Sequence, residues 1–253
     1  MNGKPVTMDI KMEWDDDTET RRRERKGVRY QILLSLCANS VVLGPAMGFG
    51  YSAVALGPLM SPPSDVKIDY NQANWIATAA ALGTPLGCVL SSIVMTYGRR
   101  LSLLVISVIS FISWITIYMS SSYEQILIGR VISGIAAGLA AVPATVYTAE
   151  IAGVKWRGTM VTWTSVAIAI GVLIVYIFGF IIKEDWRLVA LLCGLFPLVS
   201  IAIILLVLPE SYVWLRERGR LDEALEILKK LRGIPKDQSA TMDVLLELKS
   251  RNQ

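Results

Sequence analysis

Six long stretches without a charged residue constrain the fold of this chain more than any other feature. They are separated by short groups of charges, and each is about as long as the roughly 20 residues that a helix needs to cross a bilayer core. The stretches cover residues 30–64, 70–98, 101–123, 131–149, 158–182 and 188–209. They predict six transmembrane segments.

Helices suit these segments better than strands. In lipid, each backbone polar group must find a partner, and a helix provides it within the segment. Hydrophobic residues make up 53% of the chain, and the runs are too long and too apolar for the alternating strands of a membrane barrel. The predicted fold class is therefore an all-α membrane protein with six transmembrane helices over residues 30–208.

The regions on either side of the helices differ from them in composition. Residues 1–29 hold an acidic group followed by a basic group, which is typical of a solvated polar tail. In residues 209–253, apolar residues recur at helical spacing from Leu221 to Leu231 and again near Val244. We expect short amphipathic helices there, either lying on the membrane surface or forming a cytosolic bundle that braces a gate.

The distribution of Lys and Arg predicts the orientation. One side of the membrane receives most of the basic residues, and the positive-inside rule places that side in the cytosol. Its basic positions are the N-terminal tail, Arg99, Arg100, Lys155, Arg157, Arg216, Arg218 and Arg220. With six spans, both termini are expected in the cytosol and the protein in the plasma membrane.

Pairs of glycines four residues apart occur in three of the predicted helices. They are Gly44 with Gly48, Gly83 with Gly87, and Gly134 with Gly138. Such spacing lets helix backbones approach closely. The pairs in the first and fourth helices would also correspond if the six helices were two triplets related by inversion.

The residue content argues against catalysis and metal binding. The chain has no histidine, and its three cysteines lie in apolar runs, where Cys behaves as a small hydrophobe. No metal-ligand cluster or nucleophile–base pair is visible, so we expect no catalytic residue, no metal and no cofactor. The net charge is +4, but the basic residues lie beside apolar runs, so the charge does not suggest nucleic acid as a partner.

Four segments resemble the sugar porter family of the major facilitator superfamily. Gly98–Arg100 matches the end of the loop motif D-R-x-G-R-R, and Gly129–Arg130 opens the fourth helix as in the family. Pro143–Gly158 is close to P-x-Y-x-x-E-x-x-P-x-x-x-R-G, and Pro209–Leu215 is close to P-E-S-P-R-W-L. The resemblance implies the N-terminal half of a major facilitator fold, and the nearest branch looks like the facilitated trehalose transporters.

The chain departs from the family pattern at several positions. Met95 and Thr96 stand where the loop motif has Asp and its first Arg, and Tyr212 and Val213 replace the Pro and Arg of P-E-S-P-R. The Asp helps to hold one gate conformation in the family, so that control is expected to be weak here.

Charged residues at the cytosolic helix ends are candidates for a gate. The resemblance implies that they pair across helices when the cytosolic side closes, whereas a simpler reading makes them interfacial anchors. The charged candidates are Arg99, Arg100, Glu150, Arg157 and Glu210, and Gly98 of the loop motif is added to the same gate set.

Arg130 stands in an apolar sequence, where a charge costs about 2.5 to 3.5 kcal/mol at a helix centre. In proton-coupled relatives the matching Arg faces an Asp on the first helix, and that position is Ser52 here. The alternative is that Arg130 extends its side chain to the interface.

Candidate sugar-binding residues combine hydroxyls and an amide with apolar faces. Ser165 and Ile168 fall on positions that line the family's pocket, and Ser165 stands where many members have a sugar-binding Gln. The full set is Asn39, Ser52, Thr162, Ser165 and Ile168. Ser and Thr also serve as ordinary contacts between membrane helices.

The expected function is facilitative transport of a sugar, trehalose or a hexose, by alternating access. A complete porter has twelve helices, so the expected partners are the sugar, the bilayer and a missing C-terminal six-helix half or partner subunit. The alternative is a non-transporting truncated product that interacts with a full-length transporter.

Overall fold

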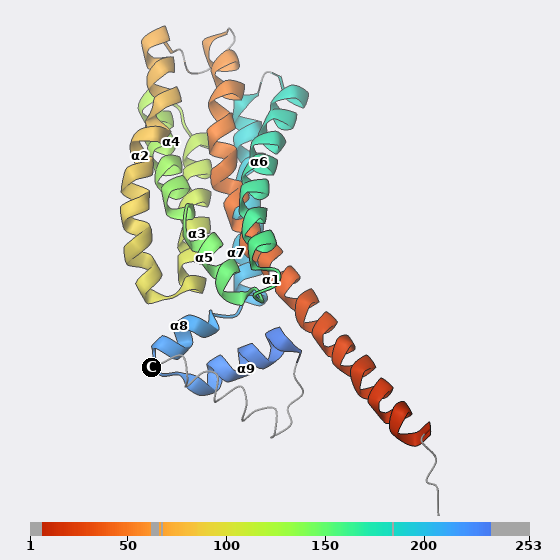
Figure 1. Cartoon of the computed structure of the whole chain (residues 1–253). Coiled ribbons are helices and arrows are strands. Elements are labelled where there is room, and N and C mark those ends of the chain that lie inside the picture. The colour runs from red at the N-terminus through yellow and green to blue at the C-terminus, as the bar shows by residue number, and fades with distance from the viewer. Residues whose placement is uncertain (1–6, 62–65, 67, 184, 234–253) are drawn as a thin grey trace, which may run out of the picture. The chain divides into compact units, whose positions relative to one another are not determined.

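The computed structural model describes residues 7–61, 66, 68–183 and 185–233, and this part of the chain is helical with short connections (Figure 1). Six helical segments within it are long and apolar enough to cross a membrane, which confirms the predicted spans. They are Glu24–Met60, Tyr70–Thr96, Arg99–Tyr118, Tyr123–Ile151, Arg157–Ile181 and Trp186–Leu206.

The spanning helices begin and end close to the charged residues that bound the uncharged stretches. The bounds are α1 Thr7–Met60, α2 Tyr70–Tyr97, α3 Arg99–Tyr118, α4 Tyr123–Ala140, α5 Pro143–Ile151, α6 Arg157–Ile181, α7 Trp186–Leu206, α8 Tyr212–Glu217 and α9 Leu221–Arg232. Two features differ from expectation. Helix α1 extends back through the predicted polar tail to Thr7, and the fourth span is divided between α4 and α5. Pro143 begins α5 because its fixed φ suits the first turn of a helix.

The chain divides into two compact units. One contains residues 34–211, which hold α2 to α7 and most of the membrane part of α1, and is called here the six-helix unit. The other combines the start of α1, up to Leu33, with the chain from Tyr212 onward.

Helices α2 and α4 pack backbone to backbone in the six-helix unit. A Cβ added to Gly83 would overlap the carbonyl oxygen of Val131, and one added to Gly134 would overlap that of Ala80. The small-residue spacing of these two helices therefore marks a close contact, as predicted. In α1, by contrast, a Cβ at Gly48 would meet a side-chain atom, the hydroxyl of Ser133.

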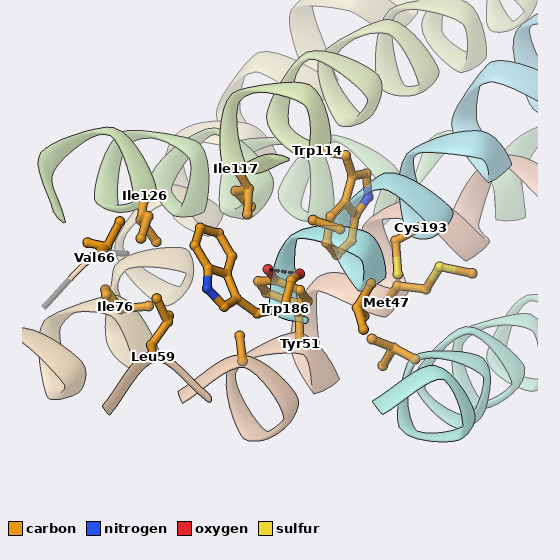
Figure 2. Close-up of a cluster of buried hydrophobic side chains, with 14 residues drawn as sticks. Met47, Tyr51, Leu59, Val66, Ile76, Trp114, Ile117, Ile126, Trp186 and Cys193 are labelled. Atoms are coloured by element: carbon orange, nitrogen blue, oxygen red, sulfur yellow. Dashed lines mark hydrogen bonds between the residues drawn. The ribbon is translucent and has the colours of Figure 1, made fainter. Parts of the chain in front are cut away.

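A buried aromatic cluster joins α1, α3 and α7. Figure 2 shows Tyr51, Trp114 and Trp186 among the smaller apolar side chains. The Tyr51 hydroxyl donates to the carbonyl oxygen of Trp186 at 3.0 Å, and Trp114 Nε1 donates to that of Gly44 at 3.3 Å. The Tyr51 and Trp114 rings meet edge to face with centroids 5.1 Å apart. The Tyr51 hydroxyl and the Trp114 indole N–H thus both have a partner, which fixes the middle of α1.

In the second unit, α9 is amphipathic as its spacing predicted. Ala224, Leu228 and Leu231 are buried, and Tyr212 of α8 packs against Leu228. Gly233 ends α9 in the left-handed conformation, with φ of 66°. The further helix expected near Val244 lies outside the described residues.

Candidate functional site

Arg130 is enclosed by the helices of the six-helix unit. Its side chain is 1% exposed, and its guanidinium donates to Ser52 Oγ at 2.6 Å, to the Gly48 carbonyl oxygen at 2.8 Å and to the Ile76 carbonyl oxygen at 3.3 Å. The guanidinium carbon also lies 5.9 Å from the centre of the Tyr51 ring. The structure therefore brings Arg130 and Ser52 together, and the three hydrogen-bond acceptors of this buried cation are neutral.

Two carbonyl groups of this site belong to helix backbones. Gly48 is on α1 and Ile76 is on α2, so Arg130 on α4 joins three spans. A guanidinium presents five N–H donors in a fixed plane, which suits several acceptors at once. Sequence reasoning missed Tyr51 and both carbonyl acceptors, although the place of Tyr51 between Gly50 and Ser52 was a usable signal for the aromatic.

A second charged cluster lies where several helices of the unit end, and is called here the helix-end cluster. Arg99 at the start of α3 donates from Nε and Nη2 to Glu150 Oε1 at 3.1 and 2.9 Å. The two side chains are 15% and 13% exposed. Glu150 Oε2 is buried without a hydrogen-bond partner. The pair thus uses one carboxylate oxygen and leaves the other as an unused acceptor.

Glu210 takes a different position in the helix-end cluster. Its Oε1 accepts from the backbone N–H groups of Arg99 and Arg100 at 2.9 and 3.0 Å. The first N–H groups of a helix have no partner within it, and the N-terminus favours negative charge. Glu210 therefore caps α3 from a segment 111 residues away in the sequence.

Gly98 makes this cap possible. Its φ is +142°, and a Cβ there would lie 2.6 Å from Glu210 Oε2. Only glycine combines this backbone conformation with so close an approach. Arg100 then donates to the carbonyl oxygens of Ile204 and Leu205 at the end of α7, at 3.2 and 2.8 Å from its Nη2.

The remaining gate candidate and one missed residue complete the description. Arg157 is exposed in the first turn of α6. The Tyr147 hydroxyl, which sequence reasoning did not select, donates to the Pro209 carbonyl oxygen at 3.0 Å. Its place in the motif of Pro143–Gly158 was the available signal. Tyr147 thus ties α5 to the segment that carries Glu210.

The candidate sugar-binding residues of α6 share one exposed side. Thr162, Ser165 and Ile168 are exposed and spaced by three residues, so they follow one stripe of the helix. The Thr162 hydroxyl donates to the Gly158 carbonyl oxygen at 2.9 Å.

Asn39 lies on a different surface. It is 4% exposed, and its Nδ2 donates to the Ser35 carbonyl oxygen at 2.8 Å. By helical periodicity it shares the side of α1 that carries Ala46, which packs against Gly171 of α6. Among the described residues, Asn39 Oδ1 and Thr164 Oγ1 are both buried without a hydrogen-bond partner. The structure thus brings Ser52 to Arg130, gathers the three α6 residues on one side, and buries Asn39 on the side of α1 that carries Ala46.

Comparison with known proteins gives one consistent family. The family model described as "Sugar (and other) transporter" matches residues 30–253. The chain is 30% identical over 222 residues to human solute carrier family 2, facilitated glucose transporter member 6, covering 85% of this chain and 43% of that protein. It is 29% identical over 208 residues to the facilitated trehalose transporter Tret1 of Drosophila grimshawi, covering 80% of this chain and 22% of that protein.

A solved structure shares the fold. The xylose transporter XylE from E. coli, in a partially occluded inward-open conformation, matches with a TM-score of 0.74 at 24% identity, covering 87% of this chain and 59% of that chain. The chain spans less than half the length of the curated relatives it matches, for example 46% of the major myo-inositol transporter IolT of Bacillus subtilis at 29% identity over 81% of this chain.

Proposed function

The chain belongs to the sugar porter family of the major facilitator superfamily, a family of transporters and not of enzymes, and from this premise we propose that its six-helix unit is one half of a facilitative sugar carrier. The sugar is trehalose or a hexose. It binds near the bilayer midplane between this unit and a second six-helix half, and the two halves rock about it.

The proposal that transport is facilitative rests on the neutral surroundings of Arg130. A carboxylate beside Arg130 could take up and release a proton, as the resemblance implies for proton-coupled relatives. Ser52 offers a hydroxyl, which accepts a hydrogen bond from Arg130 at 2.6 Å and does not titrate near neutral pH. Arg130 then has a constant charge and a constant partner through the transport cycle.

The helix-end cluster supplies the cytosolic gate in this proposal. Glu150 holds Arg99 through one oxygen and has a second, buried oxygen that is unused among the described residues, and a donor from the other half would reach it only after the side chains that cover it move. Arg157 and Arg100 contribute further charge at the same ends. A network of such contacts, each worth about 0 to 1 kcal/mol when exposed, is enough to bias two states that differ by a few kcal/mol.

The exposed stripe of α6 faces the sugar path in this proposal. Thr162 and Ser165 offer hydroxyls, and Ile168 offers an apolar surface beside them. Ser52 borders the same path through its contact with Arg130, and Asn39 supports it from its buried position on α1.

Transport by defined halves tests the proposal. The purified chain is reconstituted in liposomes alone and together with the C-terminal six-helix half of human facilitated glucose transporter member 6. We expect saturable counterflow of labelled glucose or trehalose only when both halves are present, with no dependence on an imposed pH gradient. In the same assembly, Ser52→Asp is expected to make flux depend on the gradient. Saturable flux through the chain alone would contradict the proposed half, and gradient-driven uptake by the unaltered assembly would contradict facilitation.

The proposed orientation has its own test. We propose the plasma membrane, with both ends of the chain in the cytosol, on the basis of the Lys and Arg distribution. With Cys37, Cys88 and Cys193 replaced, a single cysteine at Ser61 should react with an impermeant thiol reagent in intact cells. A single cysteine at Asp222 should react only after the cells are opened. Both positions are exposed, so protection reports the side of the membrane.

A further inference from the structure

The start of α1 has one face closed by α9. Gln31 is buried and its Nε2 donates to the Leu231 carbonyl oxygen at 2.8 Å. Gly27, one turn earlier, is also buried, and a Cβ there would lie 2.6 Å from the same carbonyl oxygen. The end of α9 therefore packs directly on the α1 backbone, and this contact fixes which side of α1 remains open.

The open side carries a row of arginines, called here the basic stripe: Arg22, Arg25 and Arg29. At 100° per residue, Arg25 and Arg29 each lie about 200° from Gly27 in opposite senses, which puts them about 40° apart, and Arg22 lies about 20° beyond Arg29. All three side chains are exposed. Arg21 and Lys26 flank the stripe, and Glu24 lies on the side of Gly27 and Gln31. The docking of α9 thus separates a side that α9 closes at Gly27 and Gln31 from a strongly basic, open one.

The basic stripe lies at the start of the first membrane span, because Arg22 precedes Glu24–Met60 and Arg25 and Arg29 fall within its first turns. Arg29 is five residues before Leu34, where the six-helix unit begins. From Arg22 to Arg29 the helix rises about 10 Å, which is comparable with the depth of a headgroup layer. Guanidinium groups bind phosphate through two parallel hydrogen bonds, and basic clusters beside a transmembrane helix attract anionic lipids.

We propose that the basic stripe binds the headgroups of anionic phospholipids in the leaflet where α1 enters the bilayer. Contact with α9 at Gly27 and Gln31 holds the rotation of α1 so that all three arginines reach the same lipid surface. Charge placement for topology alone requires only a number of cations on one side of the membrane. Headgroup binding requires them on one open face of the helix, and the structure provides that arrangement. This property goes beyond the proposed transport and is independent of which sugar is carried.

The test measures lipid binding by the full chain without any transport step. The chain in a neutral detergent is titrated with phosphatidylserine or phosphatidylcholine, and bound lipids are counted by native mass spectrometry. We expect phosphatidylserine to bind at least tenfold more tightly, with the preference lost in 0.5 M salt because screening shortens to a few ångströms. The triple variant Arg22→Gln, Arg25→Gln, Arg29→Gln should lose the preference, whereas the matched variant Lys155→Gln, Lys229→Gln, Lys230→Gln should retain it.

A third variant separates the arrangement of the stripe from its charge. Gly27→Val keeps every cation but forces α9 away from α1, and it should weaken phosphatidylserine binding several-fold. If the two triple variants lost the preference for phosphatidylserine equally, net charge and not the basic stripe would determine lipid binding, and the proposal would be overturned. Competition by free glycerophosphoserine at the concentrations where the lipid binds would indicate a soluble anion site, which also overturns it. An unchanged preference for phosphatidylserine in the triple variant of the basic stripe, or in Gly27→Val, would also overturn the proposal.

Discussion

Arg130 and Arg99 are both arginines, but their surroundings are opposite. Arg130 is 1% exposed and donates to neutral acceptors on two other spans. Arg99 has a 15% exposed side chain and donates to the carboxylate of Glu150 at the helix ends. In the interior, the cation is balanced by backbone dipoles that cannot move unless the helices separate. At the ends, water can replace either partner. The six-helix unit thus combines a fixed interior with an exchangeable edge, which suits a rigid half that rocks.

The largest expected effect comes from removing the interior cation. Arg130→Ala leaves a cavity and ends three hydrogen bonds, and we expect the free energy of unfolding to fall by about 3 kcal/mol. The measurement is unfolding in mixed micelles with increasing SDS, followed through the reactivity of the buried Cys193 thiol. Arg157→Ala, the same change at an exposed arginine, is the control and should leave the midpoint unchanged. Equal effects at both positions would remove the distinction between interior and edge.

A strained position at the edge should give the next largest effect. Gly98→Ala forces an L residue into φ of +142° and drives its Cβ toward Glu210 Oε2, so we expect a loss of about 2 kcal/mol. Gly158→Ala is the control because a Cβ there has no atom within 4 Å. The same unfolding measurement applies. A Gly98 variant as stable as the Gly158 variant would show that the turn between α2 and α3 adapts freely.

The spans and several charged positions could be predicted from the sequence because they depend on local composition. A run such as residues 158–182 must find its partners within its own helix, so its composition alone fixes its state. The pairing of Arg130 with Ser52 came from the family resemblance, which supplied the helix arrangement that composition lacks. Arg99 and Glu150 were selected together because charges of both signs recur at matching helix ends.

Other features depend on contacts between distant segments and could not be read locally. Glu210 was expected to act through charge pairing, yet it caps α3 through backbone N–H groups 110 and 111 residues away. Asn39 was selected for its amide, but that amide is buried and donates to the Ser35 carbonyl oxygen of its own helix. The helical start of α1 was hidden by a charged composition typical of solvated tails, and its contact with α9 at Gly27 became visible only in three dimensions.

Removing the cap should cost less than straining the turn. Glu210→Ala leaves the first N–H groups of α3 without their acceptor, and capping side chains contribute about 1 kcal/mol each. Combined with Gly98→Ala, the two losses should not add, because the alanine Cβ no longer meets the carboxylate. A double-mutant cycle on the free energy of unfolding measures this coupling. Strict additivity would show that strain at Gly98 is independent of Glu210.

The smallest effect belongs to the ion pair that defines the exchangeable edge. Glu150→Gln keeps the side-chain length and Arg99→Gln shortens it, each removes one charge, and the coupling between them should be about 0.5 kcal/mol at low salt. The value is small because both side chains remain reachable by water, which solvates either charge when its partner is lost. Raising the salt to 0.5 M should reduce the coupling further, since exposed charges are screened over a few ångströms. The loss caused by Arg130→Ala should not change with salt, because its acceptors are neutral and no ion reaches them. A coupling between Arg99 and Glu150 above about 2 kcal/mol that resists salt would make the edge as fixed as the interior, and the proposed cytosolic gate would then have to open elsewhere.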